Sequence, residues 1–197
     1  MTESTKNNSR RKVLIGMTAA FGAAGIPFAA TPFIAAWNPS AKAKALGAAV
    51  KVDISKIEEG QIVQVAWRKQ PVFVLRHTKS SISNLPSVET KLADPNSLAI
   101  DEPYRDLYPT RSKSDEFSIL AGVCTHLGCS PKYHPEVEPK PWDATWTGGF
   151  FCPCHGSKFD LSGRVYKGVP APTNLKVPPY NFSQTNVITI GIDPSDA

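Results

Sequence analysis

The chain has 197 residues, which allows one ordinary domain with an appendage or two small domains, and excludes a large multidomain enzyme. Its composition, 41% hydrophobic and 20% charged, excludes a fully disordered chain. The net charge of +5 is concentrated at the start, where four basic residues and one acidic residue precede position 42. The rest of the chain is nearly balanced and has no basic stripe for phosphates, so we expect no nucleic-acid partner.

The first element expected along the chain is a membrane-spanning helix over residues 13–37. No charged residue occurs between positions 13 and 41, and the 25 residues up to Trp37 are mostly apolar. As a helix they would be about 37 Å long, enough to cross about 30 Å of hydrocarbon with some tilt. A cleavable signal peptide and a buried soluble helix are the alternatives. The run is longer than the apolar core of a signal peptide, so we expect a retained anchor and leave cleavage open.

Two arginines, Arg10 and Arg11, lead directly into this apolar run. The sequence SRRKVL resembles a twin-arginine export signal, which moves folded, cofactor-loaded proteins across a bacterial membrane. A plain positively charged flank is the alternative interpretation. Both interpretations place residues 1–12 in the cytoplasm and everything after Trp37 on the other side of the membrane.

Residues 38–50 read NPSAKAKALGAAV and are predicted to be a flexible hinge or tether, because Pro39 ends the anchor helix. The body, residues 51–197, is predicted to be mostly β. Strand patterns occur at 50–54, 61–67, 72–76, 117–123 and 185–192, with a turn at 68–70. The polar stretch 79–114 is expected to leave the sheet, with one helical stretch near 88–92 and a solvated acidic face at 101–106. Short strands with loops rich in Pro and Gly favour an antiparallel sandwich or barrel.

All four cysteines fall within 31 residues, in two compact boxes. CTHLGC occupies residues 124–129 and CPCHGS occupies 152–157, so each box holds two Cys and one His. Four Cys with two His exceed the four ligands of tetrahedral zinc. A [2Fe-2S] cluster with mixed ligation needs two Cys and two His. In this chain it would use one Cys and one His from each box. One Cys of each box is then left for a disulfide, which is stable on the oxidising side of a membrane.

The two boxes resemble the signature boxes of Rieske iron–sulfur proteins. With the single N-terminal anchor, the chain resembles the Rieske subunit of a bacterial quinol–cytochrome c oxidoreductase, a cytochrome bc-type complex. The resemblance implies an antiparallel Rieske-type β-sandwich with a small cluster-binding subdomain at about residues 120–175. It implies that Cys124 and Cys152 bind one iron and that His126 and His155 bind the other. It also implies a disulfide that joins the remaining cysteines, Cys129 and Cys154.

Residues 168–175, GVPAPTNL, look like the proline loop that covers the cluster in this family. Its residues Gly168, Pro170 and Pro172 would form a stiff, apolar lid, since proline fixes the backbone and removes a donor. An ordinary Pro-rich turn is the alternative interpretation.

The resemblance also places four other residues beside the cluster: Gly156, Leu127, Ser157 and Phe159. The Ser157 hydroxyl would donate to a bridging sulfide and raise the potential. Phe159 departs from the family pattern, because many high-potential relatives have Tyr there, with a hydroxyl bonded to a ligating sulfur. Phe159 therefore predicts a lower potential than in relatives that have Tyr.

In function, the resemblance implies an electron-transfer subunit of a respiratory ubiquinol–cytochrome c reductase, a translocase of the bacterial inner membrane, with its C-terminal domain in the periplasm. His155 is the predicted catalytic residue, which takes the proton of quinol bound at cytochrome b while one electron enters the cluster. The head then swings on residues 38–50 to a c-type cytochrome. The resemblance further implies a dimeric complex with cytochrome b and c-type cytochrome subunits, and little activity of the chain alone.

Three alternatives belong to other classes. A Rieske oxygenase needs a mononuclear iron held by two His and one carboxylate. Only His77 and His134 are left over for such a site. We expect His134 to be a solvated loop residue and assign no role to His77. The chain is also too short for an oxygenase. The small Rieske subunit of another exported oxidoreductase, similar to arsenite oxidase, fits the export signal, but the anchor, spare cysteines and proline loop favour the quinol enzyme. A zinc-stabilised interaction domain would be separated by metal analysis.

Overall fold

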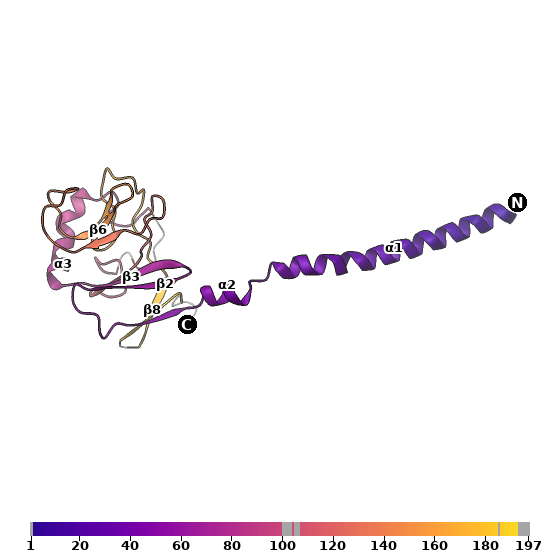
Figure 1. Cartoon of the computed structure of the whole chain (residues 1–197), viewed down its shortest axis with the longest axis horizontal. Coiled ribbons are helices and arrows are strands. Elements are labelled where there is room, and N and C mark those ends of the chain that lie inside the picture. Colours follow the sequence, from indigo (N-terminus) through magenta and orange to yellow (C-terminus); the bar gives the residue numbers. More distant parts are fainter. Residues whose placement is uncertain (1, 100–103, 105–106, 185, 193–197) are drawn as a thin grey trace. The chain divides into compact units, whose positions relative to one another are not determined.

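The computed structural model describes residues 2–99, 104, 107–184 and 186–192, and the chain divides into two units, Met1–Ala45 and Leu46–Ala197. The first unit contains one long helix, α1 (Thr2–Ala36), which runs through Pro27 and Pro32 without interruption (Figure 1). Helix α1 begins before the expected anchor, because residues 2–12 contain no Gly or Pro that would end it. The prediction of one long apolar helix near the N-terminus is confirmed.

The side chains of α1 have the exposure and composition of a membrane segment. The segment Asn8–Ala45 is long and apolar enough to cross a membrane, and none of its most apolar window is buried. The Thr31 hydroxyl donates to the carbonyl of Pro27 at 2.7 Å, which satisfies a polar group inside the helix. Large apolar side chains are exposed along the helix, among them Val13, Leu14, Ile15, Phe21, Ile26, Phe28, Phe33 and Ile34.

Part of the segment expected to be a flexible tether is helical. Helix α2 (Ala41–Leu46) has the sequence AKAKAL. Ser40 begins it, since its hydroxyl oxygen accepts a hydrogen bond from the N–H of Ala43 at 3.1 Å and its carbonyl accepts from Lys44 at 2.9 Å. Serine is a preferred residue at the start of a helix, and the Ala, Lys and Leu that follow it are strong helix formers. The composition of the segment, considered without its order, did not indicate this helix.

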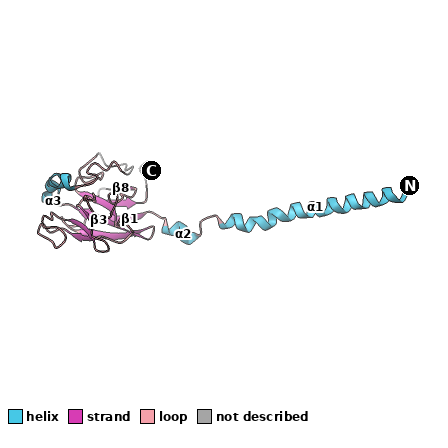
Figure 2. Cartoon of the chain, turned by 90° about the horizontal axis from the view of Figure 1, so that it is seen from above, coloured by secondary structure: helices cyan, strands magenta, loops and turns pink. Residues whose placement is uncertain are grey.

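In its described part, the second unit contains three antiparallel sheets of three strands each. Figure 2 shows the strands of this unit in magenta, with β1, β3 and β8 labelled. The first sheet has the order β1 (Val50–Asp53), β9 (Val187–Ile190), β8 (Tyr180–Gln184). The second has the order β2 (Ile62–Trp67), β3 (Gln70–Arg76), β4 (Phe117–Ala121). The third has the order β5 (Lys132–His134), β6 (Gly149–Cys152), β7 (Ser157–Phe159). The predicted antiparallel β fold is confirmed.

The second sheet lies between two hydrophobic cores, and alternation along β3 explains this. Val72 and Val74 pack in one core with residues of β1, β8 and β9. Phe73 and Leu75, which point to the opposite face, pack in the other core with residues of β6 and β7. The ring of Phe73 stacks on Phe150 with centroids 5.5 Å apart. Because both faces of β3 are covered, its sequence contains a continuous apolar run and lacks the polar–apolar alternation usual for a half-exposed strand.

The hairpin predicted around residues 68–70 is present. Strands β2 and β3 pair from Ile62↔Leu75 to Trp67↔Gln70. The two central residues, Arg68 and Lys69, have φ of 49° and 63°. Positive φ at both positions matches the type I′ turn, whose twist suits a hairpin and which usually contains Asn-Gly.

The polar excursion between β3 and β4 is more ordered and more buried than its composition predicts. It begins with α3 (Lys79–Asn84), capped by Thr78, and a 3₁₀ helix, η1 (Leu85–Lys91), near the predicted helical stretch. Arg111 is 3% exposed and donates through Nη1 and Nη2 to the carbonyls of Ser162 and Leu175, which follow β7 in the chain. The excursion therefore supports the loops that follow β7. Of the acidic segment 101–106, only Tyr104 is within the described residues.

Candidate metal centre

The first box, residues 124–129, is a tight loop between β4 and β5. The N–H of Cys124 donates to the carbonyl of Cys129 at 2.7 Å, and the N–H of Gly128 donates to the carbonyl of Cys124 at 2.9 Å. Gly128 has φ of 84°, a left-handed conformation that favours glycine. The loop brings its two cysteines together, while Leu127 at its tip is 70% exposed.

The second box is the turn that joins β6 to β7. Cys152 ends β6 and pairs with Ser157, so the residues between them form the turn. The N–H of Gly156 donates to the carbonyl of Cys152 at 2.9 Å, and Gly156 has φ of 78°. Both boxes therefore share one device: the carbonyl of the first Cys accepts the N–H of a left-handed Gly four residues later. Cys154 and His155 lie exposed on the second turn.

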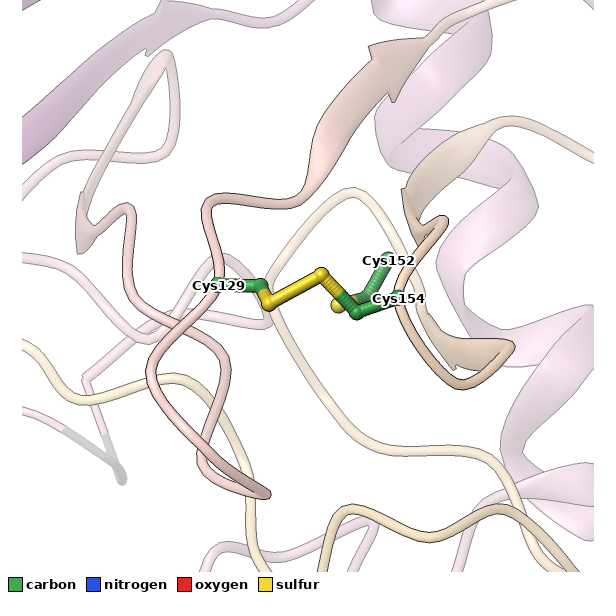
Figure 3. A group of neighbouring side chains, drawn as sticks. All are labelled: Cys129, Cys152 and Cys154. Atoms are coloured by element: carbon green, nitrogen blue, oxygen red, sulfur yellow. A yellow bond between two sulfur atoms is a disulfide. The ribbon is translucent and has the colours of Figure 1, made fainter.

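One cysteine from each box forms a disulfide, Cys129–Cys154, with a Cα–Cα distance of 6.7 Å (Figure 3). The other two, Cys124 and Cys152, are 3% and 2% exposed and have free thiols. Burial raises the pKa of the Cys152 thiol, and the adjacent Cys124 thiol raises it further. A metal cation bound to both sulfurs would reverse this effect, because thiolates are the metal-binding form.

The two histidines of the boxes meet edge to face. The ring centroids of His126 and His155 are 4.7 Å apart with an interplanar angle of 88°, although the residues come from different loops. Nδ1 of His126 is buried and has no hydrogen-bond partner among the described residues. A buried polar nitrogen without a partner is costly in a folded protein, and a metal ion is one partner that would satisfy it.

These donors fit a [2Fe-2S] cluster with mixed ligation. Two adjacent buried thiols and two adjacent imidazoles are the ligand set that such a cluster requires. The sulfur atoms of Cys129, Cys152 and Cys154 also lie within 4.8 Å of one another, but the disulfide uses two of them. This trio therefore offers one thiol and is not a separate metal site. The assignment of iron to Cys124, His126, Cys152 and His155 stays a prediction.

The predicted proline loop is hydrogen-bonded to both boxes. The hydroxyl of Thr125 in the first box donates to the carbonyl of Thr173 at 2.7 Å. The N–H of Ala171 donates to the hydroxyl oxygen of Ser157 in the second box at 3.1 Å. Gly168 has φ of 71°, Ala171 is 5% exposed, and Pro170 and Pro172 are exposed.

Ser157 and Phe159 are both fully buried on β7. The Ser157 oxygen accepts the Ala171 hydrogen bond, so its own hydrogen is available to a different acceptor. Phe159 packs in the same hydrophobic core as Cys124 and Cys152 and has no polar atom to offer them.

Buried polar residues in the segments that follow β7 were missed by the sequence analysis. The carboxylate of Asp160 accepts a hydrogen bond from Nε of Arg164 at 2.7 Å. The two residues are 1% and 3% exposed. Asn174 is also buried, and its Oδ1 accepts the N–H of Val165 at 2.8 Å while its Nδ2 donates to the carbonyl of Asp94. The DLSGR sequence, with Asp two residues before Ser and close to Gly, is the turn signal that could have revealed the first pair.

The two remaining histidines lie outside the candidate metal centre. His134 is on β5, half-buried, with its ring 5.0 Å from that of Trp142, whereas we expected a solvated loop residue. His77 is 4% exposed, and its Nε2 and Nδ1 lie 2.8 Å and 3.2 Å from the hydroxyls of Ser118 and Ser81.

Comparison with known sequence families agrees with this fold and this set of donors. The family described as "Rieske [2Fe-2S] domain" matches residues 49–179, and "Ubiquitinol-cytochrome C reductase Fe-S subunit TAT signal" matches residues 1–40. The chain therefore belongs to the Rieske iron–sulfur family. The predictions of this family, of its [2Fe-2S] cofactor and of a twin-arginine signal are confirmed.

Two relatives match almost the whole chain. The ubiquinol-cytochrome c reductase iron-sulfur subunit of Allochromatium vinosum is 46% identical over 197 residues, covering 100% of this chain and 95% of the relative. The corresponding subunit of Blastochloris viridis is 43% identical over 96% of this chain and 97% of the relative. A chain of the solved structure of a hyperthermophilic respiratory Complex III is 27% identical, with a TM-score of 0.49, over 90% of this chain and 98% of that chain.

Proposed function

We propose that this chain is the electron-transfer subunit of a ubiquinol–cytochrome c reductase, taking one electron from quinol and passing it to a c-type cytochrome. The observation that carries the proposal is the asymmetry of the candidate metal centre: Cys124 and Cys152 are buried, whereas His155 is exposed. A partner can therefore reach an imidazole while the sulfur ligands stay covered. The two relatives that match nearly the whole chain are iron–sulfur subunits of ubiquinol–cytochrome c reductase, which supports the same role.

Four side chains would hold the cluster, Cys124 and Cys152 on one iron and His126 and His155 on the other. When bound, a cluster ligated in this way supplies a one-electron acceptor whose potential is raised by its neutral imidazole ligands. The buried, unpartnered Nδ1 of His126 supports Nδ1 as the metal-binding atom of that ring. We assign the same atom to His155, which leaves Nε2 of its exposed ring for the substrate.

His155 is the proposed catalytic residue. Its Nε2 would accept a hydrogen bond from the quinol hydroxyl, take up that proton and release it to solvent on the periplasmic side. The exposed side chain of Leu127 lies next to His126 in the chain and offers an apolar contact to the subunit that holds the quinol. The disulfide Cys129–Cys154 joins the two loops that carry the histidines, which keeps the rings together.

The chain organisation proposed for this role has four parts. Residues 1–12 are cytoplasmic and contain the export signal, residues 13–37 are the anchor in the bacterial inner membrane, and residues 38–50 are the tether. Residues 51–197 form the periplasmic head, which works with cytochrome b and a c-type cytochrome in a dimeric complex. The match to an export signal, the exposed apolar helix and the disulfide support this topology.

Low-temperature EPR on membranes that contain the protein tests the proposal. Reduction with ascorbate alone should give the rhombic signal of a cluster with His and Cys ligands, and an inhibitor of the quinol site should shift it. A signal that needs dithionite would indicate a low-potential carrier and contradict quinol oxidation. Silence under both conditions, with zinc found by metal analysis, would contradict the cluster itself.

The arsenite-oxidase-like alternative is not favoured. The two relatives with 43% and 46% identity match nearly end to end and are both ubiquinol-cytochrome c reductase subunits. The similarity includes the N-terminal segment, for which the matched family describes a reductase export signal.

A further inference from the structure

A free thiol lies beside the disulfide of the candidate metal centre. The sulfur atoms of Cys129, Cys152 and Cys154 all lie within 4.8 Å of one another, and the bridge joins the first to the third (Figure 3). Cys152 is outside the bridge and is buried, so bulk solvent and external thiols do not reach it easily. Thiol–disulfide exchange needs a thiolate next to a disulfide, and Cys152 places a sulfur in that position, so the exchange proceeds through the deprotonated fraction of Cys152.

We propose that Cys152, whenever iron does not hold it, exchanges with the bridge to form Cys129–Cys152 and release Cys154. The bond between the sulfurs of Cys129 and Cys154 breaks, and a bond between those of Cys152 and Cys129 forms. The proton leaves the Cys152 sulfur and a proton is taken up by the Cys154 sulfur. The bonding electron pair departs with Cys154, so no external oxidant or reductant takes part. The inference rests on the proposed function only for the role of Cys152 as an iron ligand.

The position of the three residues decides which pairing the exchange gives. Cys152 and Cys154 are separated by Pro153 alone, and the fixed φ of proline restricts the closure of so small a ring. Cys129 comes from the other box, across the gap that the present bridge already spans. Exchange toward Cys129 therefore conserves the link between the two boxes. It also moves the free thiol from a buried residue to an exposed one, since Cys154 lies on the exposed turn.

This exchange would impose an order on assembly. If the bridge forms first, Cys152 is partly lost to a disulfide and the iron site lacks one sulfur ligand. If the cluster is assembled first, Cys152 is held by iron and the bridge closes between Cys129 and Cys154 without competition. A signal for export of folded protein fits the second order, because the cytoplasm keeps thiols reduced until the protein has crossed.

Thiol labelling of the full-length, detergent-solubilised protein tests the exchange. Iron is removed by chelation without a reductant, the protein is incubated with a maleimide, and labelled and linked residues are mapped by mass spectrometry. Tryptic cleavage does not separate Cys152 from Cys154, so fragmentation next to Pro153 must assign the label. We expect label on Cys154 and a Cys129–Cys152 link in a substantial fraction of the molecules. An intact Cys129–Cys154 bridge with Cys154 unlabelled, or label on Cys129 in place of Cys154, would overturn the proposal.

Two matched variants and the iron-loaded protein complete the test. In iron-free Cys152→Ser, labelling of Cys154 should be at least about tenfold slower than in the wild type, because the nucleophile is gone. In iron-free Cys124→Ser, Cys154 should be labelled as fast as in the wild type, because this variant removes the other free thiol and leaves Cys152 in place. Equal labelling of Cys154 in the wild type and Cys152→Ser would overturn the exchange. Fast labelling of Cys154 in the iron-loaded wild type would leave the exchange standing and contradict Cys152 as an iron ligand.

Discussion

The N–H of Ala171 in the proline loop donates to the hydroxyl oxygen of Ser157 at 3.1 Å, and both residues are buried. This hydrogen bond uses one lone pair of the Ser157 oxygen and restricts the directions in which the hydroxyl hydrogen can point. If that hydrogen bonds a sulfide of the cluster, the proline loop orients a group that stabilises the reduced, more negative state.

Ser157→Ala should therefore lower the midpoint potential of the cluster. One lost hydrogen bond of about 1 kcal/mol corresponds to about 40 mV for a one-electron couple. Redox titration followed by EPR measures the shift. The matched control is Ser118→Ala, which removes another buried hydroxyl, bonded to His77 and the Thr110 carbonyl. The control should lose stability at an unchanged midpoint, and an equal shift in both variants would contradict a local effect of Ser157.

Phe159→Tyr should raise the midpoint by tens of millivolts. Phe159 is fully buried in the core that contains Cys124 and Cys152, so a hydroxyl added to its ring can donate to a ligating sulfur. One such bond is worth about 1 kcal/mol in favour of the reduced state. The same redox titration measures the effect. Phe159→Leu, which adds no donor, should not raise the midpoint, and an unchanged or lowered midpoint in Phe159→Tyr would refute the claim.

The features that sequence reasoning predicted correctly are local ones. The turn at Arg68 and Lys69 and the strands beside it follow from alternation over a few residues, and the boxes follow from the identity of Cys and His. The short strands β5, β6 and β7 were not predicted. A strand of three residues, such as β5 or β7, is too short to show alternation, and the pairing of the four-residue β6 depends on the loops around it.

The parts of the site that were missed depend on contacts across long sequence separations. Asn174 reaches Asp94 across 80 residues, and Arg111 reaches Leu175 across 64. No local pattern distinguishes such a buried Asn or Arg from a solvated one, since both residue types are mostly exposed. Helix α2 was missed for the opposite reason: its signal is local, but composition suggested only a spacer.

His77 should make stability depend on pH. Burial lowers the pKa of His77 to about 4, against about 6.5 in an unfolded chain. As the pH falls below about 6.5, His77 binds a proton in the unfolded chain but stays neutral in the folded protein. The free energy of unfolding therefore decreases. The loss continues to about pH 4, where the folded protein also protonates, and amounts to about 3 kcal/mol.

Urea unfolding of the solubilised protein at several pH values between 4 and 7 measures this dependence. His77→Gln removes the titrating group, so the variant should be less stable at pH 7 but should lose less stability on acidification. An identical pH dependence in the variant and the wild type would assign the effect to other groups.

Stiffening the tether should slow delivery of electrons to the cytochrome. Replacing Ala41, Ala43 and Ala45 of α2 with proline converts the segment into a semi-rigid, extended spacer. The EPR spectrum of the cluster should be unchanged, because the changed residues are far from the boxes in sequence. Flash-induced cytochrome c reduction in membranes measures the rate. The same three positions changed to glycine should keep fast reduction, and normal turnover in the proline variant would count against a mobile head.

Asp160→Asn should destabilise the head strongly, because it leaves the buried guanidinium of Arg164 with only the exposed carboxylate of Glu89, 3.6 Å away, as a counter-charge. Asp160 accepts hydrogen bonds from the N–H groups of Ser162 and Arg164 as well as from the Arg164 side chain. Removing one partner of such a buried pair costs about 3–5 kcal/mol. Arg164 also donates to the carbonyl of Leu85, so the substitution should loosen the contact between η1 and the turn after β7. Urea unfolding at pH 7 checks the magnitude.

The matched control is Glu116→Gln, which weakens the partly exposed Arg76–Glu116 pair, 3.5 Å apart, and should cost less than about 1 kcal/mol. Similar losses in the two variants would mean that burial of the Asp160–Arg164 pair does not determine its contribution.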